Sequence, residues 1–220
     1  MVLTKSEVLG WIRAIGLVPV LRAESEEQAM ALAGAIADGG VTVLEVTMTV
    51  PGAVRVIARL KKERPEILLG AGTVLNAETA HECIEEGAEF VVSPAFNLKT
   101  VEMCQKHGKA VLPGALTPTE VLTAWEAGAD VVKIFPASAM GGASYLKSLK
   151  APLPQIEMIP TGGVMLGTAA EFLEAGAFAL GVGSDLVAVK KIKDGRPEVI
   201  TDIARKYLEI VREYRARHKQ

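Results

Sequence analysis

The chain is poor in several residue types, and each shortage excludes a class of protein. Aromatic residues make up 5% of the sequence, and there are two cysteines, Cys83 and Cys104. Two thiols without a close pairing motif do not make a disulfide framework or a cysteine metal site. The 24 basic and 26 acidic residues nearly cancel. Neither nucleic acid nor a membrane surface is therefore an expected partner.

Long apolar runs are also missing. None approaches the roughly 20 residues that a membrane-spanning helix requires. Residues 1–13 lack the apolar core and cleavage site of a secretory signal, so the expected location is cytoplasmic. No group of potential ligands has metal-ligand spacing, so no metal is expected. His81, His107 and His218 fall in helical or terminal polar stretches and are expected at the surface.

Glycine, in contrast, is abundant and recurs in a pattern. Four segments share an acidic helix end, a glycine, a small residue or valine, and then an apolar run rich in valine and leucine. The glycines of this repeat are Gly40, Gly87, Gly128 and Gly176. Glycine just beyond a helix is the usual C-terminal cap, and the runs that follow are typical of buried parallel strands.

The spacing of the repeat predicts the fold. The three intervals between successive glycines are 47, 41 and 48 residues, each suited to two strand–helix units. Eight strands result, each followed by a helical pattern, and a short extra helix is predicted at residues 4–14. We therefore expect one α/β domain over residues 1–220, a (β/α)8 TIM barrel. The predicted strands are 17–21, 42–46, 67–70, 89–92, 110–112, 130–134, 157–159 and 178–182.

Two charged residues interrupt the apolar strands. Glu45 lies five residues after Gly40, and Lys133 lies five residues after Gly128. The equal offsets predict equal heights on the second and sixth strands, which face each other across a barrel. Charged groups in such runs are costly to bury unless they are paired. The pair is either a structural ion pair without chemistry or a catalytic pair that contacts one small ligand.

The residue types favour the catalytic interpretation. Burial disfavours the ammonium form of Lys133, and a neutral amine attacks a ketone carbonyl. The resulting iminium accepts electrons when a carbon–carbon bond breaks, and a neighbouring carboxylate such as Glu45 transfers the protons. The pattern predicts a class I (Schiff-base) aldolase, a carbon–carbon lyase.

Glycine-rich turns follow the last two strands, at Thr161-Gly162-Gly163 and Gly183-Ser184. The same position in (β/α)8 enzymes commonly binds phosphate through backbone N–H groups. Each motif alone is also typical of an ordinary tight turn. For residues 70–73 after the third strand, both a ligand-binding role and a simple turn stay open.

Eight short motifs in order carry a resemblance over essentially the whole chain. The chain resembles the bacterial 2-keto-3-deoxy-6-phosphogluconate (KDPG) aldolase / 4-hydroxy-2-oxoglutarate (KHG) aldolase family. The motifs are Val18-Pro19-Val20-Leu21-Arg22, Leu44-Glu45-Val46-Thr47, Gly70-Ala71-Gly72-Thr73-Val74, Val92-Ser93-Pro94, Pro113-Gly114, Val132-Lys133-Ile134-Phe135-Pro136-Ala137, Pro160-Thr161-Gly162-Gly163 and Gly181-Val182-Gly183-Ser184.

The resemblance implies roles for these positions. Lys133 matches the Schiff-base lysine and Glu45 the general acid/base. The implied pyruvate pocket is Thr73, Pro94, Phe135 and Thr161; the implied phosphate site is Gly162, Gly163 and Ser184; Arg22 lines the same mouth. The family is usually homotrimeric and needs no metal or other cofactor.

One position departs from the pattern. Many family members carry an arginine for the pyruvate carboxylate where this chain has Thr49, although a branch of the family shares the threonine. Arg22 and Thr73 are therefore expected to bind more of the carboxylate.

The implied activity is reversible cleavage of KDPG to pyruvate and glyceraldehyde 3-phosphate. Alternatives are cleavage of KHG to pyruvate and glyoxylate, or of the 6-phosphogalactonate epimer. A barrel that binds a phosphorylated ligand without catalysis is the alternative of a different class. An isomerase or decarboxylase would need a second acid or a metal site, which the sequence does not offer.

Overall fold

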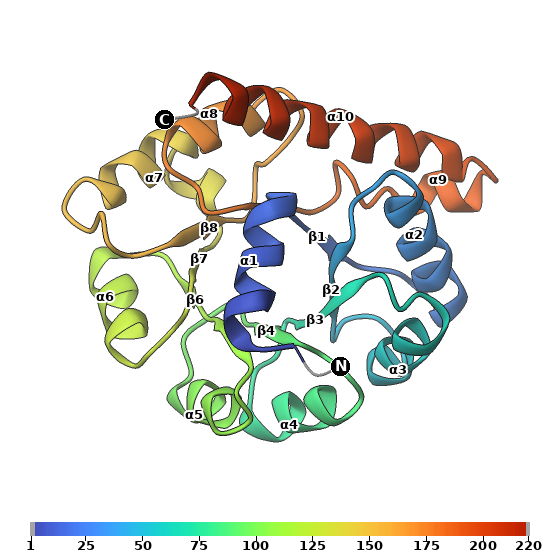
Figure 1. Cartoon of the computed structure of the whole chain (residues 1–220), viewed down its shortest axis with the longest axis horizontal. Coiled ribbons are helices and arrows are strands. Elements are labelled where there is room, and N and C mark those ends of the chain that lie inside the picture. Colours follow the sequence, from blue (N-terminus) through green and yellow to red (C-terminus); the bar gives the residue numbers. More distant parts are fainter. Residues whose placement is uncertain (1–2, 219–220) are drawn as a thin grey trace.

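Helices and strands alternate around a ring in this computed structural model, which describes residues 3–218 (Figure 1). The strands are β1 (Leu17–Leu21), β2 (Val43–Thr47), β3 (Leu68–Gly72), β4 (Phe90–Val92), β5 (Ala110–Leu112), β6 (Gly114–Ala115), β7 (Val132–Ile134), β8 (Met158–Pro160) and β9 (Leu180–Val182). The helices are α1 (Lys5–Ile15), α2 (Glu26–Asp38), α3 (Ala53–Glu63), α4 (Ala77–Glu85), α5 (Leu98–Lys106), α6 (Pro118–Glu126), η1 (Ala137–Met140), α7 (Ala143–Lys150), α8 (Ala169–Glu174), α9 (Val189–Lys193) and α10 (Pro197–Arg217).

The strands form a curled parallel sheet in two parts. Six strands pair in the order β5-β4-β3-β2-β1-β9, and three pair in the order β6-β7-β8. Pro113 alone separates β5 from β6; it has no N–H to donate to a ladder. At the other junction an isolated parallel bridge joins Thr161 to Gly181. The predicted α/β class with parallel strands is confirmed, as a TIM-like fold.

Two apolar cores lie on opposite faces of the sheet. The larger lies between the sheet and the surrounding helices, and the smaller lies on the inner face. Val18 and Val43 in the strands, and Val131 directly before β7, belong to the inner core, as expected from the period of two in a strand. Val8 and Ile12 of α1 belong to the same cluster, so this helix packs against the inner core near the starts of the strands (Figure 1).

The ends of α1 are well satisfied. Thr4 and Glu7 form a capping box at its start, which satisfies backbone N–H groups that have no partner within the helix. At its end, the guanidinium of Arg215 in α10 donates to the carbonyl oxygens of Arg13 and Ala14. The predicted extra helix at residues 4–14 is thus confirmed, one residue later than expected. Helix α1 covers the amino ends of the strands, so a functional site is expected at their carboxyl ends.

The predicted strands 17–21 and 110–112 match β1 and β5 at both ends, and the other six differ from the structure by one or two residues at their ends. β2 and β3 each run further along the chain than expected, to Thr47 and Gly72. Ala71 and Gly72, interpreted from the sequence as part of the turn after this strand, are therefore strand residues. No helix within residues 3–218 has both the length and the apolar character that crossing a membrane requires.

Candidate active site

Glu45 and Lys133 lie on the inner face of the sheet, from β2 and β7. Each follows an inner-core valine by two residues, Val43 and Val131, and so points to the same side. Their residues are 2% and 5% exposed, and Lys133 Nζ lies 3.7 Å from Glu45 Oε1. The structure thus brings together the two charged residues that the repeat spacing placed opposite each other.

The electrostatic setting of Glu45 suits a proton carrier. Its Oε1 is fully buried and has no hydrogen-bond partner within residues 3–218, since 3.7 Å to Lys133 exceeds hydrogen-bond length. Burial raises the pKa of the Glu45 carboxyl above its ordinary value, and the positive charges of Lys133 and Arg22 oppose this rise without cancelling it. A carboxyl with a raised pKa holds a proton closer to neutral pH, as general acid/base catalysis requires.

Two glycines of β3 make room for inner-face side chains. A Cβ atom on Gly72 would overlap the Glu45 carboxylate, and one on Gly70 would overlap the ring of Phe90. Neither glycine has a positive φ, so the requirement is space and not backbone freedom. The sequence left two interpretations open for residues 70–73, a ligand-binding role or an ordinary turn. For Gly70 and Gly72 the structure indicates a third: they are small because neighbouring side chains, among them that of Glu45, fill the space.

Thr73 and Pro94 follow β3 and β4 at the same end of the sheet. Thr73 adopts φ 56°, a left-handed conformation that is costly for a β-branched residue and often found at functional sites. The backbone of Pro94 packs where Gly114 lacks a Cβ atom. The hydroxyl of Ser93 donates to the Ala95 carbonyl at 2.7 Å, which fixes this loop.

A pocket of about 600 Å³ opens over the carboxyl ends of β1, β7, β8 and β9. Its lining includes six residues singled out in the sequence: Arg22, Phe135, Thr161, Gly162, Gly163 and Ser184. Phe135 connects it to the buried pair, because Lys133 Nζ lies 5.4 Å from the centre of its ring. Thr73 and Pro94 are not part of this lining, so the predicted residues fall into two groups.

The turn after β8 is shaped for close approach by backbone groups. Gly162 and Gly163 have φ values of 95° and 76°, which glycine adopts without strain. Gly181 has no room for a Cβ atom, because Thr161 Oγ1 occupies that space. The two glycine motifs therefore lie against each other at adjacent strand ends, and they form one concave surface.

Several residues that line the pocket were not predicted from the sequence. Asp185 is the most informative: its Oδ2 accepts hydrogen bonds from the backbone N–H of Leu166 at 3.1 Å and the Tyr207 hydroxyl at 2.5 Å. It therefore ties the segment after β8 to α10. The one sequence feature that could have identified Asp185 is its position directly after Ser184, a predicted phosphate-binding residue. The apolar lining residues, including Val20 and Val187, cannot be told from core residues by sequence.

Thr49 contributes to local packing. Its hydroxyl lies 2.6 Å from that of Thr47, which donates to the Leu21 carbonyl at 2.9 Å. Because Thr47 has a single proton to give, Thr49 is the donor in their contact. The Thr49 residue itself is exposed.

Comparison with known proteins identifies the family independently of the geometry. The profile of the "KDPG and KHG aldolase" family matches residues 8–203. The 2-dehydro-3-deoxy-phosphogluconate aldolase of Treponema pallidum is 36% identical over 200 residues, covering 91% of this chain and 95% of that protein. The 2-dehydro-3-deoxy-6-phosphogalactonate aldolase of Escherichia coli is 36% identical over 178 residues, covering 80% and 86%.

A solved structure matches as well. It is the KDPG aldolase of Legionella pneumophila with pyruvate captured as a covalent carbinolamine intermediate, with a TM-score of 0.83 and 31% identity. The match covers 90% of this chain and 96% of that one. From the family profile and these relatives, the chain belongs to the KDPG and KHG aldolase family.

Proposed function

We propose that the chain is a class I aldolase that reversibly cleaves KDPG to pyruvate and glyceraldehyde 3-phosphate. The observation that carries the proposal is the buried Lys133–Glu45 pair, 3.7 Å apart, beside a pocket lined by glycine-rich turns. The family relationship supports it, because the Legionella relative holds pyruvate as a covalent carbinolamine.

Lys133 Nζ attacks the C2 ketone, and loss of water from the carbinolamine gives an iminium. Glu45 removes the proton of the C4 hydroxyl as the C3–C4 bond breaks, and the bond electrons move into the iminium to form an enamine. Protonation at C3 and hydrolysis of the imine release pyruvate and restore the lysine. The covalent Schiff base supplies the electron sink, so the reaction needs no metal or other cofactor.

We assign the site residues to the two halves of the substrate; Phe135 and Thr161 line the pocket but belong with Thr73 and Pro94 to the pyruvate half. Thr73, Pro94, Phe135 and Thr161 hold the pyruvate half, while Arg22 lies at the mouth and shares the carboxylate with Thr73. Gly162, Gly163 and Ser184 bind the phosphate through backbone N–H groups. The pocket over β8 and β9 supports this second assignment.

Trapping tests the nucleophile. Incubation with pyruvate and borohydride is expected to add one reduced pyruvate to Lys133, located by peptide mass spectrometry. An unmodified Lys133 in folded protein would overturn the mechanism and would leave a non-catalytic phosphate-binding barrel as the better reading.

A substrate panel tests the second half of the proposal. Relatives named for the gluconate and the galactonate substrates are both 36% identical, so identity does not decide the C4 stereochemistry. We expect kcat/KM for pyruvate release to be highest with KDPG, lower with its galactonate epimer and lowest with KHG. A preference for unphosphorylated KHG would contradict the phosphate assignment but not the Schiff base.

We also propose the full architecture and assembly. β5 and β6 act as one strand broken at Pro113, and the Thr161–Gly181 bridge closes an eight-stranded barrel that forms one domain over residues 1–220. A cytoplasmic homotrimer is expected, and the exposed Leu122 and Trp125, three residues apart on α6, support an interface. Light scattering at a mass of three chains tests it.

A further inference from the structure

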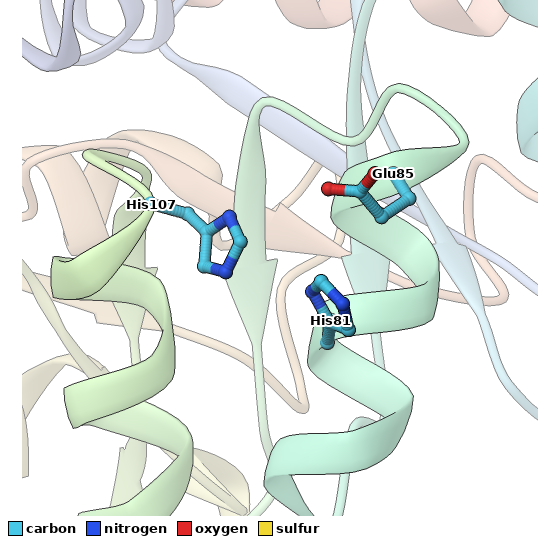
Figure 2. A group of neighbouring side chains, drawn as sticks. All are labelled: His81, Glu85 and His107. Carbon is cyan, nitrogen blue, oxygen red and sulfur yellow. The ribbon is translucent and has the colours of Figure 1, made fainter.

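We propose that His81, Glu85 and His107 form a zinc-binding site on the outside of the fold. Figure 2 shows the three side chains converging, His81 and Glu85 from α4 and His107 from the end of α5. One ligand atom from each residue lies within 4.8 Å of the others. In the sequence these histidines look like unrelated surface residues, and only the packing of α4 against α5 brings them together.

The backbone holds the three ligands in place. His81 and Glu85 are four residues apart on one helix and so share a face. His107 caps α5, where its N–H donates to the carbonyl oxygens of Met103 and Cys104. The two imidazole rings lie 4.9 Å apart between centroids. The site therefore needs side-chain rotation, not movement of the helices.

The local charge favours a cation. Within residues 3–218, none of the three side chains takes part in an ion pair or in a side-chain hydrogen bond. Lys109, two residues beyond His107, is engaged by Glu89 at 2.5 Å. Lys106 lies in the last turn of α5, but the last turn of α4 has no basic residue, so the negative end of the α4 dipole is not neutralised there.

The ligand set selects the metal. Two imidazoles and one carboxylate suit zinc with a water in the fourth position, whereas calcium and magnesium prefer oxygen ligands alone. Ligands at about 2.1 Å from a tetrahedral ion lie roughly 3.4 Å apart. The ligand atoms lie within 4.8 Å of one another, so they need to approach by about 1.4 Å at most. His81 and Glu85 are exposed and His107 is half-buried, which leaves them free to do so.

The position predicts the effect of binding. Glu85 and His107 come eight and nine residues after the first residues of α4 and α5, or about 12–14 Å along each helix. Thr73 and Pro94 precede the opposite ends of these helices. The metal therefore clamps α4 to α5 and stabilises the fold without entering the active site, and the site does not depend on the proposed reaction.

Calorimetric titration of the chelator-stripped, full-length protein with zinc chloride tests the site. We expect one ion per chain, with affinity lowered at least tenfold in His81→Gln and in His107→Gln. His218→Gln, at an exposed histidine that also faces a glutamate, Glu174, is the matched control and is expected to retain wild-type affinity. Circular dichroism checks that each variant is folded.

Thermal unfolding gives a second readout. Zinc at a hundredfold excess over its Kd should raise the Tm of the wild type by roughly 5 °C or more, and magnesium should not. The rise should disappear in His107→Gln. Absence of saturable binding, or binding that survives both His81→Gln and His107→Gln, would overturn the proposal.

Discussion

The two ends of the inner face of the sheet are built from the same strands but have opposite character. Near the strand starts, Val43 and Val131 pack in an apolar layer with Val8 and Ile12 of α1. Two residues further along, Glu45 and Lys133 occupy the same face with nearly the same burial, 2% and 5% exposed. Burying two charges is costly even when they are paired. The comparison indicates that the apolar layer offsets the instability of the charged one.

The largest effect is expected from Lys133→Ala. Loss of the nucleophile removes the covalent route, so kcat/KM for pyruvate release should fall by at least about 10³-fold. A coupled assay of pyruvate measures this. Lys147→Ala, at an exposed lysine of α7, should leave the rate unchanged. Pyruvate release at the wild-type rate in Lys133→Ala would show that the charged layer is structural only.

The apolar layer should respond in the opposite way. Ile12→Ala removes a fully buried side chain of α1 and should lower the free energy of unfolding by about 2–5 kcal/mol. The activity of the molecules that remain folded should be nearly normal. Urea unfolding and active-site titration separate the two quantities. Ser6→Ala, on the exposed side of the same helix, should change neither.

Gly72→Ala tests whether the charged layer depends on its spacing. The added Cβ overlaps the Glu45 carboxylate, so that side chain must leave its present position beside Lys133. We expect kcat to fall by roughly 10–100-fold, because a displacement of about 1 Å is enough to cause such a loss. Gly10→Ala, with nothing within 4 Å of the new Cβ, is the control. Normal kcat in Gly72→Ala would mean that the position of Glu45 is not critical.

The smallest expected effect is a change in how the free energy of unfolding depends on pH. Burial raises the pKa of Glu45 above its ordinary value of 4.5, so the folded state holds this proton to higher pH than the unfolded state. The associated stability is fully present below pH 4.5 and is lost as pH rises through the raised pKa. Glu45→Gln cannot titrate, so its unfolding free energy should fall less over that range than that of the wild type.

Urea melts at a series of pH values from 4 upwards measure this difference in slope. The loss of the partner of Lys133 adds an offset, so the slope and not the absolute stability is the test. Glu213→Gln, at an exposed carboxyl of α10, should keep the wild-type slope. Parallel curves for Glu45→Gln and the wild type would contradict the raised pKa.

The sequence predicted the features that depend on local pattern. Cap glycines and apolar runs located the strands, and the equal offsets of Glu45 and Lys133 from these glycines predicted that the two would meet. The predicted end of β3, at Gly70, was two residues short, because Gly72 has low strand propensity and owes its place to packing. The role of Asp185 could not be predicted, since its partners Leu166 and Tyr207 come from distant segments.

The hydrogen bonds from Arg215 to the end of α1 have a consequence for synthesis. Helix α1 shares an apolar cluster with Phe178 and Ala179, and its end is held by Arg215, about 200 residues further along the chain. Contacts so distant in sequence form slowly. The apolar face of α1 therefore stays partly uncovered until Phe178, Ala179 and α10 have been made, and the nascent protein is most prone to aggregate before α10 emerges.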